Sequence, residues 1–302
     1  MRSSDSYLEK ALAEFNDKVN ALENSGNERE LIDAYLNRGS VLSMMDSIFS
    51  AIDDFQEAID LIKKLESEGT VLDPGYTIKA YISRGELQSE ETMKDMLDDY
   101  RVAASKLKEI GDSCRFYDRK DLIEMCIDCS GDLIDNDFCE DAKPFLDKGL
   151  SLVVGEKDAY SRNRYVELNN LAGQANMDGE SAETAMKYFS ESVRVGRELI
   201  TAGEIESEMD LVLALVYKGD VEEVLGKTDD LISDREAAIE LLETMKYENR
   251  LDDEELLSNL HGETAQIYMK QGRIKDAEKH LVKQVAYNLS GSTQYLDENA
   301  ER

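Results

Sequence analysis

The chain has 302 residues, enough for one large domain or two ordinary ones with a sizeable core. A hydrophobic fraction of 41% excludes a disordered chain, and the presence of only 2 Pro favours helices. With 66 acidic and 35 basic residues the net charge is −31, which argues against binding to nucleic acids or anionic membranes and favours either basic partners or simple solubility.

The first predicted element is a helix over 6–24, in which Ala11 and Phe15 resemble half of a repeat. The first ten residues, MRSSDSYLEK, lack the apolar core of a signal peptide. No stretch of the chain approaches the roughly 20 apolar residues of a membrane span. These features predict a soluble, cytoplasmic protein.

Residues 32–68 are predicted to form the first pair of helices. The second helix of the pair carries Ala51, Phe55 and Ala58 at spacing i, i+4, i+7, which places them on one helical face. The phrase AYLNRGS of the first helix returns as AYISRGE, and the glycines of the two phrases lie 46 residues apart. Such an equal spacing of similar phrases indicates a repeat array.

Five further segments carry the same pattern, over 75–111, 118–155, 160–203, 205–249 and 252–290. The small residues that stay in phase with Gly39 are Gly85, Gly131, Gly219 and Ala265. We expect each small residue to let the two helices of its pair approach closely while an aromatic partner fills the neighbouring gap. Because one pair cannot cover its own apolar face, the pairs should stack into a single array over 1–302 that ends in a polar tail at 291–302.

These units resemble the tetratricopeptide repeat, and the clearest of them, HGETAQIYMKQGRIKDAEKHL at 261–281, supplies Ala, Tyr, Gly, Ala and Leu at the expected separations. The period is about 46 instead of 34 residues, as in the longer repeats of kinesin light chains. The resemblance implies an all-α, right-handed superhelical α-solenoid of six antiparallel helix pairs with an N-terminal capping helix. It also implies a non-catalytic protein–protein interaction scaffold whose concave groove binds a peptide or a helical segment.

The resemblance places Asn37, Asn169 and Asn170 in that groove, where an Asn amide can hold a peptide backbone. The alternative is a solvated Asn on an exposed helix. Three bases precede in-phase glycines: Arg38, Arg84 and Lys218. They predict a basic ladder that binds acidic groups of a ligand, although among so many carboxylates we favour internal ion pairs.

Four cysteines, Cys114, Cys126, Cys129 and Cys139, fall within 26 residues, and two of them form the motif CIDC. Four thiolates would suit zinc, so Cys126 and Cys129 are weak metal-site candidates. The motif sits inside a predicted helix without a second C-x2-C motif or a preceding strand, which favours buried structural thiols.

The only histidines, His261 and His280, belong to different predicted helices and have no local partner motif. His261 stands where the tetratricopeptide repeat has a large aromatic residue, so packing explains it. No nucleophile–base–acid set and no cofactor fingerprint is apparent, so we expect a protein that is not an enzyme and needs no cofactor. Two alternatives to the scaffold stay open. One is a structural repeat protein that forms a homodimer or a larger homo-oligomer, and the other is a metal or redox sensor built on the cysteines.

Overall fold

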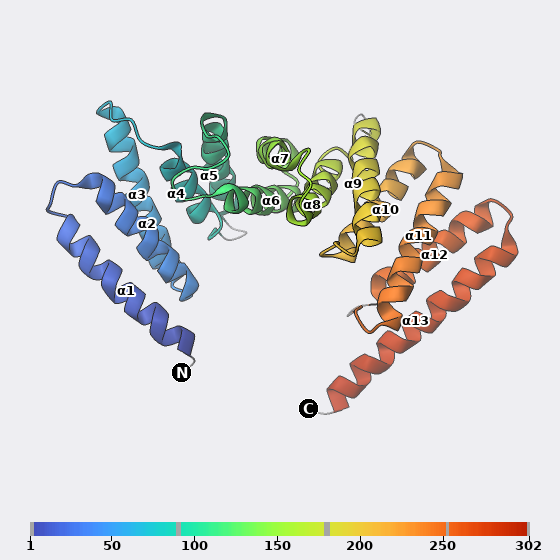
Figure 1. The fold of residues 1–302 in the computed structure, drawn as a ribbon. Coiled ribbons are helices and arrows are strands. Elements are labelled where there is room, and N and C mark those ends of the chain that lie inside the picture. The colour runs from blue at the N-terminus through green and yellow to red at the C-terminus, as the bar shows by residue number, and fades with distance from the viewer. Residues whose placement is uncertain (1–2, 89–91, 178–181, 252–253, 301–302) are drawn as a thin grey trace. The chain divides into compact units, whose positions relative to one another are not determined.

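The computed structural model describes residues 3–88, 92–177, 182–251 and 254–300, and within these ranges every named element is a helix (Figure 1). The α-helices are α1 (Ser3–Leu22), α2 (Glu28–Met44), α3 (Ile48–Ser67), α4 (Pro74–Gly85), α5 (Met93–Lys106), α6 (Arg119–Asp135), α7 (Cys139–Val153), α8 (Ala159–Gln174), α9 (Ala182–Ala202), α10 (Glu208–Val224), α11 (Thr228–Tyr247), α12 (Glu255–Lys270) and α13 (Ile274–Ala300). The prediction of an all-α helical-repeat fold is confirmed. None of the described helices combines the length and apolar character needed to cross a bilayer.

Capping side chains explain where the first helix of a helix pair begins. Asp73 accepts a hydrogen bond from the Gly75 amide at 2.8 Å, and Pro74 occupies the first turn of α4, where its missing N–H costs nothing. Asp118 caps α6 through the Lys120 amide at 2.7 Å in the same manner. These caps satisfy free backbone N–H groups in the first turns of α4 and α6 and so define where the two helices begin.

Glycines bring the two helices of a pair together, as the repeat pattern predicts. A Cβ atom on Gly39 would lie 2.8 Å from Phe55, and one on Gly85 would lie 2.7 Å from Tyr100. Only a glycine allows the aromatic ring this close to the first helix. The aromatic rings fill the gap and are almost fully buried, with 1% exposure each.

The third in-phase glycine, however, does not have this role. A Cβ atom on Gly131 would meet nothing within 4 Å. The close approach in the fourth pair occurs instead at Gly173, where a Cβ atom would lie 2.4 Å from the Phe189 ring. The step of 46 residues therefore does not hold between the third and the fourth pair, where α7 has 15 residues and the corresponding helix of the first pair, α3, has 20.

The chain groups into two compact units, residues 1–152 and 153–302, and each unit is described by itself. The single array over 1–302 stays a prediction. In the first unit α2 packs on α3 and α4 on α5, with α1 against α2. In the second unit α8 packs on α9, α10 on α11 and α12 on α13. At the C-terminal end α13 continues to Ala300, across the residues from 291 for which we expected a polar tail.

Candidate functional site

The predicted basic ladder lies inside the helix pairs as ion pairs. Arg38 donates to Asp54 on α3 through Nη2 at 2.6 Å and Nε at 2.7 Å, and Arg84 donates to Asp99 on α5 through Nε at 2.8 Å. The two aspartates are 4% and 2% exposed. Each arginine already has its bidentate carboxylate partner, which agrees with the internal ion pairs that we favoured. A further contact of these arginines with a ligand stays a prediction.

Lys218 repeats this arrangement in the second unit. Its Nζ lies 2.6 Å from Glu222 and also contacts Asp234 on α11. The buried Arg235 that follows Asp234 contacts Asp220 on α10. The bases before the glycines therefore serve to join the first helix of a pair to the second.

The three predicted groove asparagines differ in their surroundings. Asn37 is exposed, and its amide donates to Asp33 O of the same helix at 2.6 Å. Asn169 and Asn170 are buried, and the Asn170 amide spans from α8 to Asp210 O on α10 at 2.9 Å. Asn170 also accepts a hydrogen bond from the Ser192 hydroxyl at 2.7 Å. Binding of a peptide by Asn170 would require these internal hydrogen bonds to break, so Asn37 is the candidate that remains accessible.

A run of carboxylates on α6 is the most distinctive surface feature of the first unit. Glu124, Asp128 and Asp132 are spaced i, i+4, i+8 and therefore share one side of the helix, and Asp128 and Asp132 are exposed. We call these three residues the acidic row. Loss of hydration, and then the charges of Glu124 and Asp132, raise the pKa of Asp128. The row is thus crowded with like charge.

Glu86, at the end of α4, extends the same negative field. Loss of hydration raises the pKa of its carboxyl, the nearby Lys79 opposes this rise, and Asp128 and Asp132 add to it. Loss of hydration also lowers the pKa of Lys79. The field of the acidic row therefore reaches from α6 to α4, and it would be relieved by a cation supplied from outside.

Asp210 on α10, in the second unit, is another carboxyl with a raised pKa. Burial, and then the charge of Glu167, raise its pKa to about 6, while Arg164 opposes the rise. Arg164 contacts both Glu167 and Glu206. In each unit a helix, α6 in the first and α10 in the second, thus presents carboxylates whose negative charge is only partly compensated.

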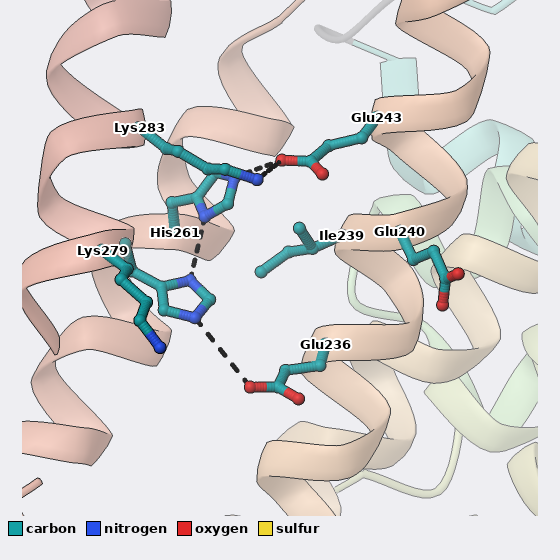
Figure 2. A pocket seen from close by; sticks show the side chains of 8 residues that line it. Glu236, Ile239, Glu240, Glu243, His261, Lys279 and Lys283 are labelled. Carbon is teal, nitrogen blue, oxygen red and sulfur yellow. Dashed lines mark hydrogen bonds and ion pairs between the residues drawn. The ribbon is translucent and has the colours of Figure 1, made fainter. Parts of the chain in front are cut away.

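The two histidines, which belong to different predicted helices, meet in a cavity of about 230 Å³ between α11, α12 and α13 (Figure 2). His261 Nδ1 lies 2.9 Å from His280 Nδ1, so one nitrogen donates and the other accepts, and a single proton joins the pair. His261 Nε2 lies 3.3 Å from Glu243 and His280 Nε2 lies 3.9 Å from Glu236. Burial, and then the neighbouring His280, lower the pKa of His261 to about 4.

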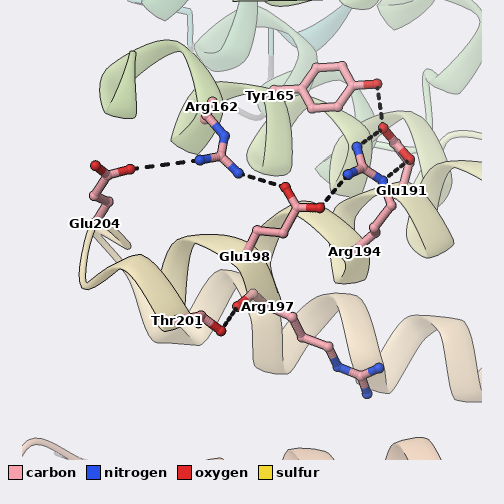
Figure 3. Close-up of polar contacts among 8 residues, drawn as sticks. All are labelled: Arg162, Tyr165, Glu191, Arg194, Arg197, Glu198, Thr201 and Glu204. Carbon is pink, nitrogen blue, oxygen red and sulfur yellow. Dashed lines mark hydrogen bonds and ion pairs between the residues drawn. The ribbon is translucent and has the colours of Figure 1, made fainter. Parts of the chain in front are cut away.

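An ion network joins α8 to α9 (Figure 3). The Glu198 carboxylate contacts the guanidinium of Arg162 at 2.8 Å and that of Arg194 at 2.6 Å. Arg194 also contacts the Glu191 carboxylate at 2.6 Å. The hydrogen bond that Arg194 donates lowers the pKa of Glu191, and the positive charge of Arg194 adds to this effect. Arg162 and Arg194 have carboxylate partners, so this network offers little positive charge to an anionic ligand. Exposed pairs of this type stabilise a fold by at most about 1 kcal/mol each.

The CIDC cysteines lie within α6 with their thiols buried, as expected for structural residues. Cys126 and Cys129 are 0% exposed, and neither forms a disulfide. Burial raises the pKa of the Cys126 thiol to about 12. Across the described residues, no group of three or more His, Cys, Asp or Glu side chains has the geometry to hold a metal ion. A metal or sensor role for these two cysteines stays an untested alternative.

Comparison with known proteins places the chain by its fold. No family model matches it, and no curated protein sequence matches it. Three solved structures share the arrangement of helices. RapI in its apo form is 18% identical with a TM-score of 0.58, and the match covers 92% of this chain and 75% of RapI. Aspartyl phosphate phosphatase F from Bacillus subtilis is 15% identical with a TM-score of 0.55, and the match covers 99% of this chain and 78% of that one.

The third structure, BtubC from P. vanneervenii, is 14% identical with a TM-score of 0.51, and the match covers 79% of this chain and 92% of that one. At these identities the likeness concerns the fold. The predicted resemblance to tetratricopeptide-like repeats is confirmed at that level.

Proposed function

We propose that this protein is a non-catalytic scaffold that binds a basic segment of a partner protein, and that the acidic row of α6 is the main contact. The proposal rests on the tetratricopeptide-like repeat fold, in which rigid helix pairs carry a surface for another chain. The single observation that carries it is the acidic row with Glu86 beside it, since crowded carboxylates favour a cation in their midst.

The overall charge supports this choice of partner. The chain carries 31 more acidic than basic residues, and bases such as Arg38, Arg84 and Lys218 contact carboxylates inside the helix pairs. The excess negative charge must therefore lie on surfaces that a partner can reach. Complementary charge of this kind raises the association rate and weakens with salt.

The spacing of the acidic row indicates what the basic segment looks like. Carboxylates four residues apart on a helix are separated by about 6 Å along its axis. In an extended peptide, alternate side chains on one face are about 6.8 Å apart. An extended segment with Lys or Arg at every second position therefore matches the row, and each of three cations would meet one carboxylate.

The experiment is a fluorescence anisotropy titration with a labelled peptide of alternating Lys and Ser. The wild-type protein should bind this probe and ignore an alternating Glu and Ser peptide. The double variant Glu124→Gln, Asp128→Asn should bind it about tenfold more weakly, the equivalent of roughly 1.4 kcal/mol. Asp132 is left unchanged because it accepts a hydrogen bond from the buried Tyr100 hydroxyl at 2.8 Å.

The matched control is Glu9→Gln, Glu14→Gln on α1, which removes the same charge from exposed positions elsewhere. This control should change the affinity less than about twofold if the row itself is the contact. Equal losses in the two double variants would show only general charge attraction and would refute the proposed site.

A further inference from the structure

The last helix leaves an apolar face uncovered. Leu281, Val282, Val285 and Leu289 lie within about 100° of one another around α13, and they are 37%, 70%, 57% and 65% exposed. We call these four residues the end stripe. Large apolar side chains gathered on one exposed helical face mark an interaction site more often than isolated ones do.

The repeat explains why this face is apolar. Val285 lies four residues after Leu281, as Ile59 follows Phe55, Val193 follows Phe189 and Ile239 follows Arg235. Those three equivalents are almost fully buried, at 0%, 5% and 5% exposure.

Neighbouring helices cover the equivalents in the second unit. Val193 and Ile239 belong to one core cluster that includes Leu211 of α10 and Leu257 and Leu260 of α12. The end stripe thus presents, on the last described helix, a surface that elsewhere in the fold receives another helix.

The charge beside the end stripe indicates what kind of helix it receives. From Lys270 to Lys283 the chain carries five Lys or Arg residues and two Asp or Glu residues, so the local charge is positive in a protein of net charge −31. Lys275, Lys279 and Lys283 are spaced i, i+4, i+8 and form one edge of α13 beside the stripe. At physiological salt such local charges dominate, because the screening length is about 8 Å.

This basic edge favours a partner helix with an acidic edge over one with a basic edge, because opposite charges in contact attract and like charges repel. A helix with carboxylates along the facing edge avoids this repulsion. Part of the positive charge is already compensated, since Lys279 contacts Asp276 at 3.1 Å and Lys283 contacts Glu243.

We propose that the end stripe binds an amphipathic helix of a partner protein, whose apolar face covers Val282, Val285 and Leu289 and whose acidic edge lies along Lys275 and Lys279. This is a second contact surface, distinct from the acidic row and of opposite charge preference. The contact would join two helices through their apolar faces, since Val282, Val285 and Leu289 stand at i, i+3 and i+7 on one face of α13.

The test uses synthetic helices of about five turns as probes. The acidic probe carries Leu at i, i+3, i+4 and i+7 with Glu along one edge, and the basic probe replaces those Glu residues by Lys. We expect the wild-type protein to bind the acidic probe at least tenfold more tightly than the basic one. Val285→Glu should weaken binding of the acidic probe at least tenfold, while Val71→Glu, at an 87% exposed valine between α3 and α4, should leave it unchanged.

A charge swap separates this contact from unspecific adhesion. The variant Lys275→Glu, Lys279→Glu should reverse the preference, so that the basic probe binds more tightly. Binding of the alternating Lys and Ser peptide to the acidic row should be the same in Val285→Glu as in the wild type, so the two proposals fail independently. Circular dichroism of each variant checks that the helices are intact.

Two results would overturn the proposal. One is an acidic probe that binds Val285→Glu as tightly as the wild type. The other is a wild-type dimer, by light scattering, that Val285→Glu converts to a monomer, because the end stripe would then be the contact between copies.

Discussion

Asp99 on α5 is held by Arg84 on α4, with 2.8 Å between Arg84 Nε and Asp99 Oδ2, directly beside the contact of Gly85 with Tyr100. The same four-residue arrangement joins α2 to α3, where Arg38 holds Asp54 next to Gly39 and Phe55. In each case a base–glycine step on the first helix meets an acid–aromatic step on the second. The ion pair and the ring contact therefore fix the register of a helix pair together.

Removing one partner of this pair should be costly. The Asp99 side chain is 3% exposed and that of Arg84 is 18% exposed, so Asp99→Ala leaves a guanidinium largely buried without its carboxylate. We expect a loss of about 3 kcal/mol in the free energy of unfolding, the lower end of the range for breaking a buried pair. Urea denaturation followed by circular dichroism measures it.

The matched control is the more exposed pair of Arg101 and Asp141, whose side chains are 53% and 24% exposed and whose atoms lie 2.8 Å apart. Asp141→Ala should cost less than about 1 kcal/mol, because exposed ion pairs contribute little. If Asp99→Ala proved as mild as the control, the pair would not be fixing the register.

The repeat fold could be predicted because its signal is local and periodic. Small residues and apolar faces recur along the chain, and a helix needs no distant partner to show its period. The acidic half of the ion pairs was also readable: Asp54 and Asp99 stand directly before Phe55 and Tyr100, just as Arg38 and Arg84 stand before their glycines.

The rest depends on how helices meet in space. His261 and His280 are 19 residues apart and share no motif, yet they contact each other because they lie at similar distances on either side of the turn at Gly272. A strict step of 46 residues led to Gly131 and missed Gly173, because a change in helix length, such as that of α7 against α3, shifts every later position. The end stripe became apparent only when the exposure of α13 was compared with that of earlier helices.

Two glycines should respond to alanine in opposite directions. At Gly173 a new Cβ atom would overlap three atoms of the Phe189 ring at 2.4 to 2.8 Å, so Gly173→Ala must displace a buried ring. We expect a loss of about 1 to 3 kcal/mol. At Gly131 the space is open and the backbone is helical, so Gly131→Ala should stabilise by up to about 1 kcal/mol. Thermal unfolding of both variants decides the matter, and a stabilised Gly173→Ala protein would contradict the close approach seen in the structure.

The four thiols should separate into two classes. Cys126 and Cys129 are fully buried, and burial raises the pKa of both, whereas Cys114 and Cys139 are half-buried. Burial also raises the pKa of Cys114, so the difference between the classes is access to the reagent. Cys114 and Cys139 should therefore react first with a disulfide reagent at pH 8, and the CIDC thiols only after unfolding. Peptide mapping by mass spectrometry identifies the modified residues. Prompt reaction of Cys129 in the folded protein would instead favour the redox-sensor alternative.

The histidine pair should make stability depend on pH. His261 has a pKa near 6.5 when unfolded, and burial with His280 beside it lowers this pKa to about 4 in the folded protein, although Glu243 favours the charged form and Lys283 opposes it. Between pH 4 and 6.5 the unfolded chain therefore binds a proton at His261 that the folded protein does not bind, which favours unfolding. Above pH 6.5 neither state binds this proton, so the full stability is present there.

As the pH falls from about 6.5 to 4, stability should be lost progressively, by up to about 3 kcal/mol at 1.36 kcal/mol per unit. In His261→Gln this part of the pH dependence should vanish, while the titration of the many carboxylates remains common to both proteins. Urea denaturation at several pH values across that window gives the difference between the two curves. Parallel curves would mean that His261 has the same pKa in the folded and the unfolded protein, contrary to the lowering by burial and by the neighbouring His280.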